Sequence, residues 1–259
     1  MKKILLLASL TALVASSAFA LTASDNASNY GVGWTDGSNF GTGFAAWSLS
    51  NNDGGGSAPF AGNFIGDSTA GAGDINTGTS QSFGLYANPG SAESIAIRSF
   101  STALSVGDQF SFDLGVNYND GNKGFNLRTA GDSIFNFNVG GGASVSSDNA
   151  TIIPGAGLGY DYGGNDVMIE AVLEVISSSS INYQISRTSS LGYQGILFSG
   201  TVTGIVGSID NFQFYNTGSN GGDQNNLYFN NLKVVPEPHA YAVLASLSAL
   251  LFVMTRRRR

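Results

Sequence analysis

Apolar and polar residues alternate along much of the chain between residues 21 and 235. The clearest stretch is residues 109–118, where five apolar residues, beginning with Phe110, occupy every second position. Side chains of a β-strand point to opposite faces in turn, so this period of two predicts a strand with one buried face and one solvated face. Residues 181–187 and 209–216 repeat the pattern, so strands are expected in both halves of the span.

Short strand candidates recur throughout this span, with Gly, Asn and Ser between them. We count about eleven and find no convincing helix. The ambiguous stretch is DVMIEAVLEVI, residues 166–176, which we assign to a strand because of its β-branched residues. Such a pattern predicts an all-β domain over residues 21–235, and its very polar outward positions favour an antiparallel β-sandwich, jelly-roll or lectin-like, over a lipid-facing barrel.

The two ends of the chain differ from this body. Residues 1–20 combine Lys2 and Lys3 with an apolar run and a small-x-small site at Ala18-Phe19-Ala20. This order is typical of a secretory signal peptide that is cleaved after Ala20. We therefore expect the protein to be exported and the mature chain to begin near Leu21.

The other end, residues 236–259, has three parts in order. Pro236-Glu237-Pro238 comes first, an apolar run over residues 240–254 follows, and Arg256, Arg257, Arg258 and Arg259 close the chain. As a helix, about 15 residues rise about 22 Å, which is short of a hydrocarbon core of about 30 Å, but long Arg side chains extend the effective span. The positive-inside rule places the arginines in the cytoplasm and the body outside.

This three-part tail resembles the PEP-CTERM sorting signal of bacterial exported proteins. The resemblance covers only about the last 25 residues of the chain. It implies recognition of Pro236-Glu237-Pro238 by an exosortase, removal of the tail, and a role at the cell surface, in biofilm or in an exopolysaccharide matrix. More loosely, the body resembles the Gly/Asn-rich β-sandwich ectodomains found before such signals, and lectin-like jelly rolls.

Charge and composition exclude some functions. Between residues 21 and 235 there are 5 Lys plus Arg and 17 Asp plus Glu, so the balance is 5 − 17 = −12. An acidic domain whose few Lys and Arg residues are scattered lacks the basic patch that nucleic-acid binding requires. The chain has no Cys, and its one His, His239, lies in the tail. Residues 21–235 therefore cannot form a Ser-His or Cys-His catalytic pair. They also lack the Cys and His ligands of an ordinary zinc site.

Carboxylate catalysis is also weakly supported. Glu170 and Glu174 would share a strand face, but four residues along a strand is about 13 Å. Glycosidase pairs need roughly 5–9.5 Å between their carboxyl groups. We therefore predict that the protein is not an enzyme, with a glycoside-active enzyme as the remote alternative.

Two kinds of binding site remain as candidates. Loop residues with oxygen side chains could bind calcium, although the same residues beside Gly are ordinary turn formers. Aromatic residues could stack on sugars, although the two Trp could equally belong to the core. The calcium candidates are Asn117, Asn119, Asp120, Asp161 and Asp166, and the sugar-stacking candidates are Trp34, Trp47 and Tyr118, together with Tyr86 and Tyr160.

These observations lead to one main functional hypothesis and one alternative. The main hypothesis is a non-enzymatic β-sandwich, sorted to the cell surface, that contributes to extracellular matrix or adhesion. The alternative is a carbohydrate-binding module that acts on a cell-surface polysaccharide or exopolysaccharide.

Overall fold

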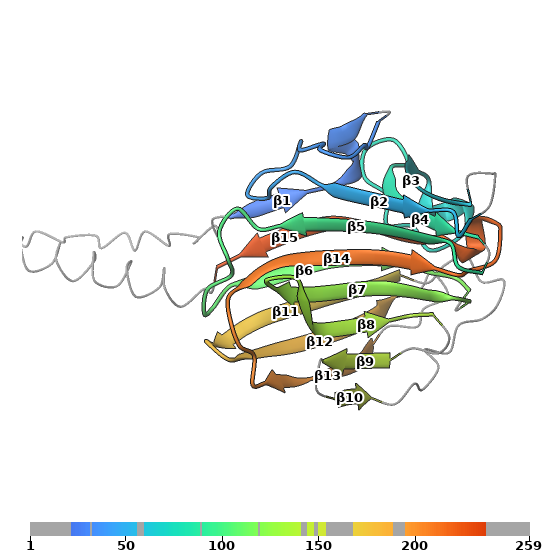
Figure 1. Ribbon diagram of the computed structural model, residues 1–259. Coiled ribbons are helices and arrows are strands. Elements are labelled where there is room, and N and C mark those ends of the chain that lie inside the picture. The colour runs from blue at the N-terminus through green and yellow to red at the C-terminus, as the bar shows by residue number, and fades with distance from the viewer. Residues whose placement is uncertain are drawn as a thin grey trace, which may run out of the picture. The chain divides into compact units, whose positions relative to one another are not determined.

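The protein is an antiparallel β-sandwich, described by a computed structural model from residue 22 to residue 236 (Figure 1). Within that range the described residues exclude 32, 56–59, 89, 119, 141–143, 148, 149, 154–167 and 189–194. The fold therefore confirms the predicted antiparallel sandwich. The predicted signal peptide, the apolar run and the arginines of the tail lie outside the described residues.

One sheet, called here the first sheet, has eight strands within the described residues. Their order is β13 (Gly195–Thr203), β12 (Ser180–Thr188), β11 (Met168–Ser177), β6 (Gln109–Gly115), β15 (Leu227–Val235), β4 (Ser82–Ala87) and β3 (Ala61–Gly66), and β1 (Ala23–Asp25) also pairs with β15.

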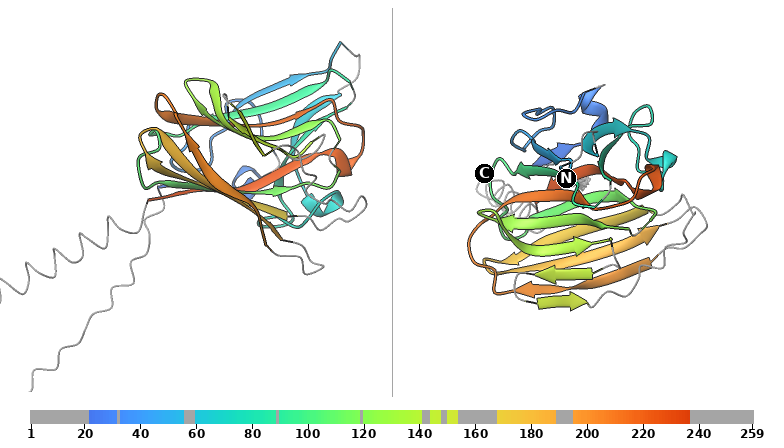
Figure 2. Two further views of the ribbon diagram at one scale, coloured as in Figure 1. Left: turned by 90° about the horizontal axis from the view of Figure 1, so that it is seen from below. Right: turned by 45° about the vertical axis from the view of Figure 1, so that its right-hand side comes forward.

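The second sheet has seven strands within the described residues. Their order is β10 (Ala150–Ile153), β9 (Ser144–Ser147), β8 (Asp132–Asn138), β7 (Asn122–Thr129), β14 (Ile209–Thr217), β5 (Glu93–Ser99) and β2 (Ser48–Asn52). Figure 2 shows the two sheets as facing layers. Three short 3-10 turns lie in the connections: η1 (Ala27–Tyr30), η2 (Ser68–Ala70) and η3 (Asp223–Asn225).

Aromatic side chains from the two sheets fill the space between them. In β6, Phe110, Phe112 and Leu114 are buried while the residues between them are partly exposed, as the alternation predicts. Phe112 meets Phe125 of β7 with ring centroids 4.3 Å apart. Phe214 of β14 stacks on Phe229 of β15 at 3.9 Å. Such packing buries large apolar areas and provides most of the stabilisation of a chain without disulfides.

The strand assignment of residues 166–176 is confirmed for its described part. β11 alternates between buried and partly exposed positions, and both Glu170 and Glu174 lie on its outer face. The sequence prediction missed four strands, β1, β3, β9 and β10. They have three to six residues each. Such short strands show too few residues for a period of two, and pairing with neighbours defines them.

Within the described residues, no helix is long and apolar enough to cross a membrane.

Candidate functional site

The two tryptophans predicted to stack on sugars lie in the core. Trp34 is 3% exposed and Trp47 is 1% exposed. Their rings meet edge to face at 5.3 Å, and Phe83 and Phe229 of the first sheet pack against both. Neither indole presents a face to solvent, so the prediction of sugar stacking is wrong for these two residues. The alternative reading, that they are core aromatics, is confirmed.

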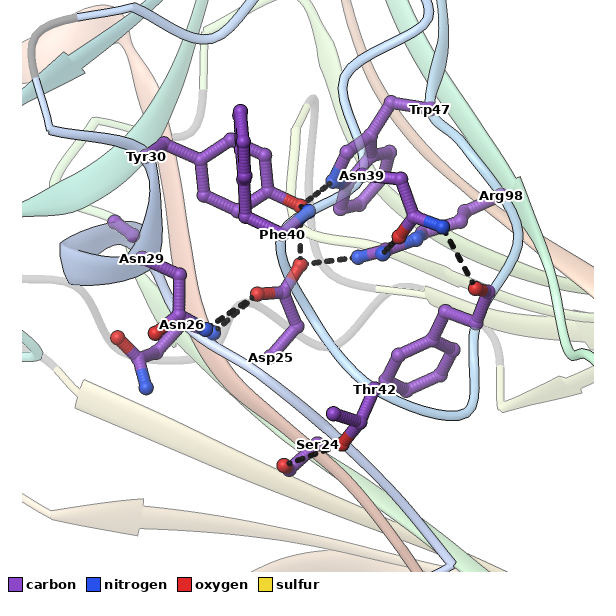
Figure 3. Close-up of polar contacts among 12 residues, drawn as sticks. Ser24, Asp25, Asn26, Asn29, Tyr30, Asn39, Phe40, Thr42, Trp47 and Arg98 are labelled. Atoms are coloured by element: carbon purple, nitrogen blue, oxygen red, sulfur yellow. Dashed lines mark hydrogen bonds and ion pairs between the residues drawn. The ribbon is translucent and has the colours of Figure 1, made fainter.

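Trp47 also borders a buried polar cluster, the Asp25–Arg98 cluster, which Figure 3 shows. Arg98 of β5 forms an ion pair with Asp25 of β1, and both side chains are fully buried. The Tyr30 hydroxyl donates to Asp25 Oδ2 at 2.6 Å and accepts from Trp47 Nε1 at 3.0 Å. The Asn29 amide donates to Asp25 Oδ1 at 2.8 Å. The carboxylate therefore has partners on both oxygens.

The Arg98 guanidinium is equally well satisfied. Its Nε donates to the Ala45 carbonyl at 2.7 Å and its Nη2 donates to Asn39 Oδ1 at 2.6 Å. The guanidinium carbon lies 4.8 Å from the Phe44 ring centroid and 4.9 Å from the Trp47 ring, within cation–π range. A buried ion pair needs such complete satisfaction to offset its desolvation. The cluster fixes the N-terminal segment to the second sheet and leaves no donor or acceptor for a ligand.

Burial also changes the acidity of the cluster's phenol. Loss of solvation, with the hydrogen bond to Asp25 as a smaller cause, raises the pKa of Tyr30 to about 12. The hydroxyl therefore stays protonated at physiological pH and serves as a hydrogen-bond donor to Asp25. This is a structural role.

An open pocket lies instead on the outer face of the first sheet, between β3, β4 and the loop before β15. Its aromatic residues are Phe64 and Tyr86, both half-buried, with ring centroids 6.2 Å apart. Each ring lies across a glycine of the neighbouring strand. Phe64 is paired with Gly84, and Tyr86 with Gly62. We call this feature the Phe64–Tyr86 pocket.

The two glycines allow the rings to approach the backbone of the sheet closely. A Cβ atom at Gly84 would lie 2.2 Å from Phe64 Cζ, and one at Gly62 would lie 2.5 Å from the Tyr86 hydroxyl. No side chain fits under either ring at such distances. Tyr228 of β15 supports Phe64 from one side, edge to face at 5.8 Å.

Polar side chains complete the pocket. Its remaining lining residues are Asn88, Asn220, Gly221, Gly222, Asp223 and Asn226, and its volume is 320 Å³. Small-molecule sites typically have volumes of about 300–1,000 Å³, with apolar walls and a few polar groups. Asn220 and Asp223 are exposed, so an amide and a carboxylate face solvent across from the rings.

The deeper polar groups of the pocket are held in place. Asn226 is buried, and its amide donates to the Tyr228 hydroxyl at 3.3 Å. Burial raises the pKa of Tyr228 to about 12, and the carboxylates of Asp223 and Asp67 act in the same direction. The phenol is therefore neutral at physiological pH. Beside its aromatic residues, the pocket itself offers the amides of Asn88, Asn220 and Asn226 and the carboxylate of Asp223 as hydrogen-bonding groups.

A buried lysine supports the pocket loop from inside the sandwich. Lys123 of β7 is fully buried, and its Nζ donates to the Asn225 carbonyl in η3 at 2.8 Å. Asn216 of β14 donates to the same carbonyl at 3.2 Å. Desolvation lowers the pKa of Lys123 to about 7, against a smaller opposing effect of Asp120. Unlike Arg98, this cation forms no ion pair among the described residues.

The other predicted site residues are distributed as follows. Tyr118 is half-buried, its backbone amide donates to the Gln224 carbonyl at 3.0 Å, and it is not a lining residue of the Phe64–Tyr86 pocket. Of the sugar-stacking candidates that the structure describes, Tyr86 alone lines that pocket. Tyr160 lies outside the described residues, and so do Glu237 and Pro238 of the predicted sorting motif. The sequence prediction missed Phe64, for which only a cross-strand pairing with Gly84 could have been a signal.

The calcium candidates are not brought together as a site within the described residues. Asn117 is buried. Asp120 accepts from the Gly121 amide at 3.0 Å within its own turn, and from the Asn220 amide at 2.9 Å, a bond that joins two loops. Asn119, Asp161 and Asp166 lie outside the described residues. Across that part of the chain, no group of three or more His, Cys, Asp or Glu side chains is placed to hold a metal ion.

The structure places one carboxylate pair that the sequence did not indicate. Asp113 of β6 is directly opposite Glu170 of β11. Burial, and secondarily Glu170, raise the pKa of Asp113, although a hydrogen bond from Asn231 at 2.7 Å opposes the shift. The pair lies on the outer face of the first sheet, and β15 separates it from the strands of the Phe64–Tyr86 pocket.

Comparisons with known proteins give structural likeness alone. No protein-family model matches the chain, and no curated protein sequence matches it. One similar solved structure is lectin I-B4 from Griffonia simplicifolia in its metal-free form, with a TM-score of 0.41 and 9% identity over 72% of this chain and 98% of that chain. A second is the VIP36 exoplasmic/lumenal domain in its Ca²⁺-bound form, with a TM-score of 0.39 and 12% identity over 71% of this chain and 86% of that chain. A third is a glycosyl hydrolase family protein from Mycobacterium fortuitum, with a TM-score of 0.38 and 11% identity over 73% of this chain and 90% of that chain.

Proposed function

We propose that this protein is a non-catalytic carbohydrate-binding β-sandwich that takes one sugar ring in the Phe64–Tyr86 pocket. The observation that carries the proposal is the pair of half-buried rings that lie over Gly84 and Gly62, with their planes tilted by 42° to each other. The exposed face of an aromatic ring suits the apolar C–H face of a pyranose. The amides and the carboxylate around the rings suit its hydroxyl groups.

Charge favours a neutral sugar over an acidic one. Asp223 lines the pocket, and the body has a balance of 5 − 17 = −12 over residues 21–235. The negative electrostatic potential that this charge produces repels an anionic ligand such as a uronic acid. The proposed ligand is therefore a neutral hexose or N-acetylhexosamine unit.

A glycan array and titration with the mature chain test this proposal. Tyr86→Ala removes one ring, and we expect at least a tenfold loss of affinity for the best glycan, about 1.4 kcal/mol. Asp223→Asn keeps the shape of the pocket and loses a strong acceptor, so a smaller loss is expected. Tyr215→Ala is the matched control, since Tyr215 is half-buried on the second sheet.

Two results would contradict the proposal. One is an array on which the folded mature chain binds no glycan. The other is an array on which Tyr86→Ala binds every glycan as tightly as the unaltered protein does. Circular dichroism of each variant separates a lost site from a lost fold.

We further infer that the protein works at the cell surface, where its tail would have delivered it. The support for this is the order of Pro236-Glu237-Pro238, the apolar run and the arginines. Glu237→Ala leaves the apolar run and the arginines that set the membrane topology unchanged. In a host with the sorting enzyme, the variant is therefore expected to stay in the membrane with its tail uncut. Membrane fractionation with mass measurement of the C-terminus is the readout. Normal cleavage of that variant would remove the support for surface sorting.

A further inference from the structure

A row of polar side chains crosses four neighbouring strands of the first sheet. Gln109 of β6 is paired with Glu174 of β11, and Glu174 is paired with Asn182 of β12. Asn182 is in turn paired with Thr201 of β13. All four lie on the outer face, because their chain neighbours Phe110, Leu173 and Val202 point into the core. Paired residues share a face, so the row runs at right angles to the strands.

A second row runs parallel to the first, two residues further along each strand. Val172 is paired with Gln184, and Gln184 with Ser199. The two rows line a hollow of 440 Å³ on this face. Strand spacing makes four strands about 14 Å wide, and two residues of rise separate the rows by about 7 Å. We call this hollow the transverse groove.

The groove differs from the outer face of the second sheet in how its polar groups are used. There, the Asn136 amide donates to Asn126 Oδ1 at 2.7 Å and to the Tyr215 hydroxyl at 2.9 Å. Asn126 also donates to Gln213 Oε1 at 3.4 Å. These amides bind one another, so that face needs no ligand.

In the transverse groove the polar groups remain available. Thr201 Oγ1 donates to Asn182 Oδ1 at 2.7 Å, which fixes the amide and leaves its NH₂ group directed elsewhere. Gln184 makes one long bond, to Ser186 Oγ at 3.4 Å. Among the described residues, Gln109 and Glu174 form no side-chain hydrogen bond. Along one line the groove therefore offers donors, an acceptor and a hydroxyl, spaced by one strand each.

We propose that the transverse groove binds a linear neutral glycan that lies across the strands, over a few consecutive sugar rings. The proposal rests on the proposed carbohydrate-binding function and adds a second site to it. Alternating amide, carboxylate and hydroxyl groups match the hydroxyl pairs of successive sugars. Glu174 is the one charged side chain among the groove residues named here, so an acidic polysaccharide is disfavoured.

The experiment compares hexasaccharides in a background that lacks the aromatic pocket. Cellohexaose, maltohexaose and chitohexaose are titrated at millimolar concentration into the full chain carrying Tyr86→Ala, with hexagalacturonic acid as the acidic comparator. The groove variant adds N182A and Q184A. The matched control adds N126A and Q213A instead, on the outer face of the second sheet.

We expect at least one neutral hexasaccharide to bind the Tyr86→Ala protein, the groove variant to bind it at least tenfold more weakly, and the control to bind it unchanged. The proposal is overturned if the groove variant and the control bind equally, if the acidic hexasaccharide binds best, or if no neutral hexasaccharide binds the Tyr86→Ala protein. In that last case, glycan binding by the unaltered protein would still support sugar binding in the Phe64–Tyr86 pocket. Hexasaccharide binding that needs Asn182 and Gln184, together with a glycan array that Tyr86→Ala leaves unchanged throughout, would support the groove and overturn the pocket.

Discussion

The Asp25–Arg98 cluster and the Phe64–Tyr86 pocket use the same kinds of residue for opposite purposes. Each combines aromatic rings with amides and a carboxylate. In the cluster, Asp25 and Arg98 find partners within the protein, and two aromatic rings flank the guanidinium. In the pocket, the rings are half-buried and Asp223 is exposed.

The difference shows what separates a structural polar site from a binding site. A buried charge is tolerated when its donors and acceptors are satisfied internally, and then nothing is left for a ligand. A binding site needs the reverse, a surface whose polar groups still face water and whose rings are exposed on one side. Tryptophan was the obvious candidate for such a surface, but here both tryptophans belong to the core.

The largest expected effect concerns the Asp25–Arg98 cluster. Asp25→Ala leaves the Arg98 guanidinium buried without its counter-ion, so the free energy of unfolding should fall by about 3–5 kcal/mol. Chemical denaturation followed by fluorescence of Trp34 and Trp47 measures it. Asp132→Ala, at an exposed position in β8, is the control and should change stability by less than about 0.5 kcal/mol. Equal stabilities of the two variants would show that the ion pair contributes nothing net.

Two glycines, Gly124 in the second sheet and Gly84 in the pocket, provide a comparison. At Gly124 of β7 a Cβ would lie 2.0 Å from the Phe137 carbonyl oxygen, which is backbone and cannot move aside cheaply. Gly124→Ala should cost about 1–3 kcal/mol of stability. At Gly84 the clash is with the tip of the Phe64 ring, which can swing outward.

Gly84→Ala should therefore cost less than about 1 kcal/mol of stability, yet weaken glycan binding by displacing the ring. Denaturation and glycan titration of both variants measure the two effects. If Gly84→Ala kept full glycan affinity, a Phe64 ring that approaches the sheet closely would not be required for binding.

A pH-dependent effect concerns Lys123, which lies beneath the pocket loop. The pKa of Lys123 is lowered to about 7 in the folded protein, from 10.5 in the unfolded chain. Between these values the unfolded state binds more protons, so this residue makes stability rise as the pH increases from about 7 toward 10.5. Above about 10 the raised pKa values of Tyr30, Tyr215 and Tyr228, each about 12, act in the opposite direction.

Lys123→Met should remove the rise of stability between about pH 7 and pH 10 and should be most stabilising, relative to the unaltered protein, below pH 7. Unfolding free energies measured across this range test it. An unchanged pH profile would mean that Lys123 is solvated more fully than its burial indicates.

The strands were predictable where the period of two extends over enough residues. Residues 109–115 and 209–217 place Phe110, Phe112, Phe212 and Phe214 in the core, as their alternation indicates. The candidate site was predictable only in part. Tyr86 was among the aromatic candidates, but Phe64 was not, because its position in the pocket depends on the pairing of β3 with Gly84 of β4.

The sequence by itself determined the class of fold, because alternation along a strand is set by backbone geometry and the two faces can be read locally. The tertiary structure decided which aromatic residues face solvent. Trp34 and Trp47 lie in loops without a period, and the packing of Phe83 and Phe229 on both rings is what buries them. Phe64 and Tyr86 stay half-exposed because glycines from the neighbouring strand lie beneath them, and that arrangement is fixed by sheet register, which couples residues about twenty positions apart or more in the chain.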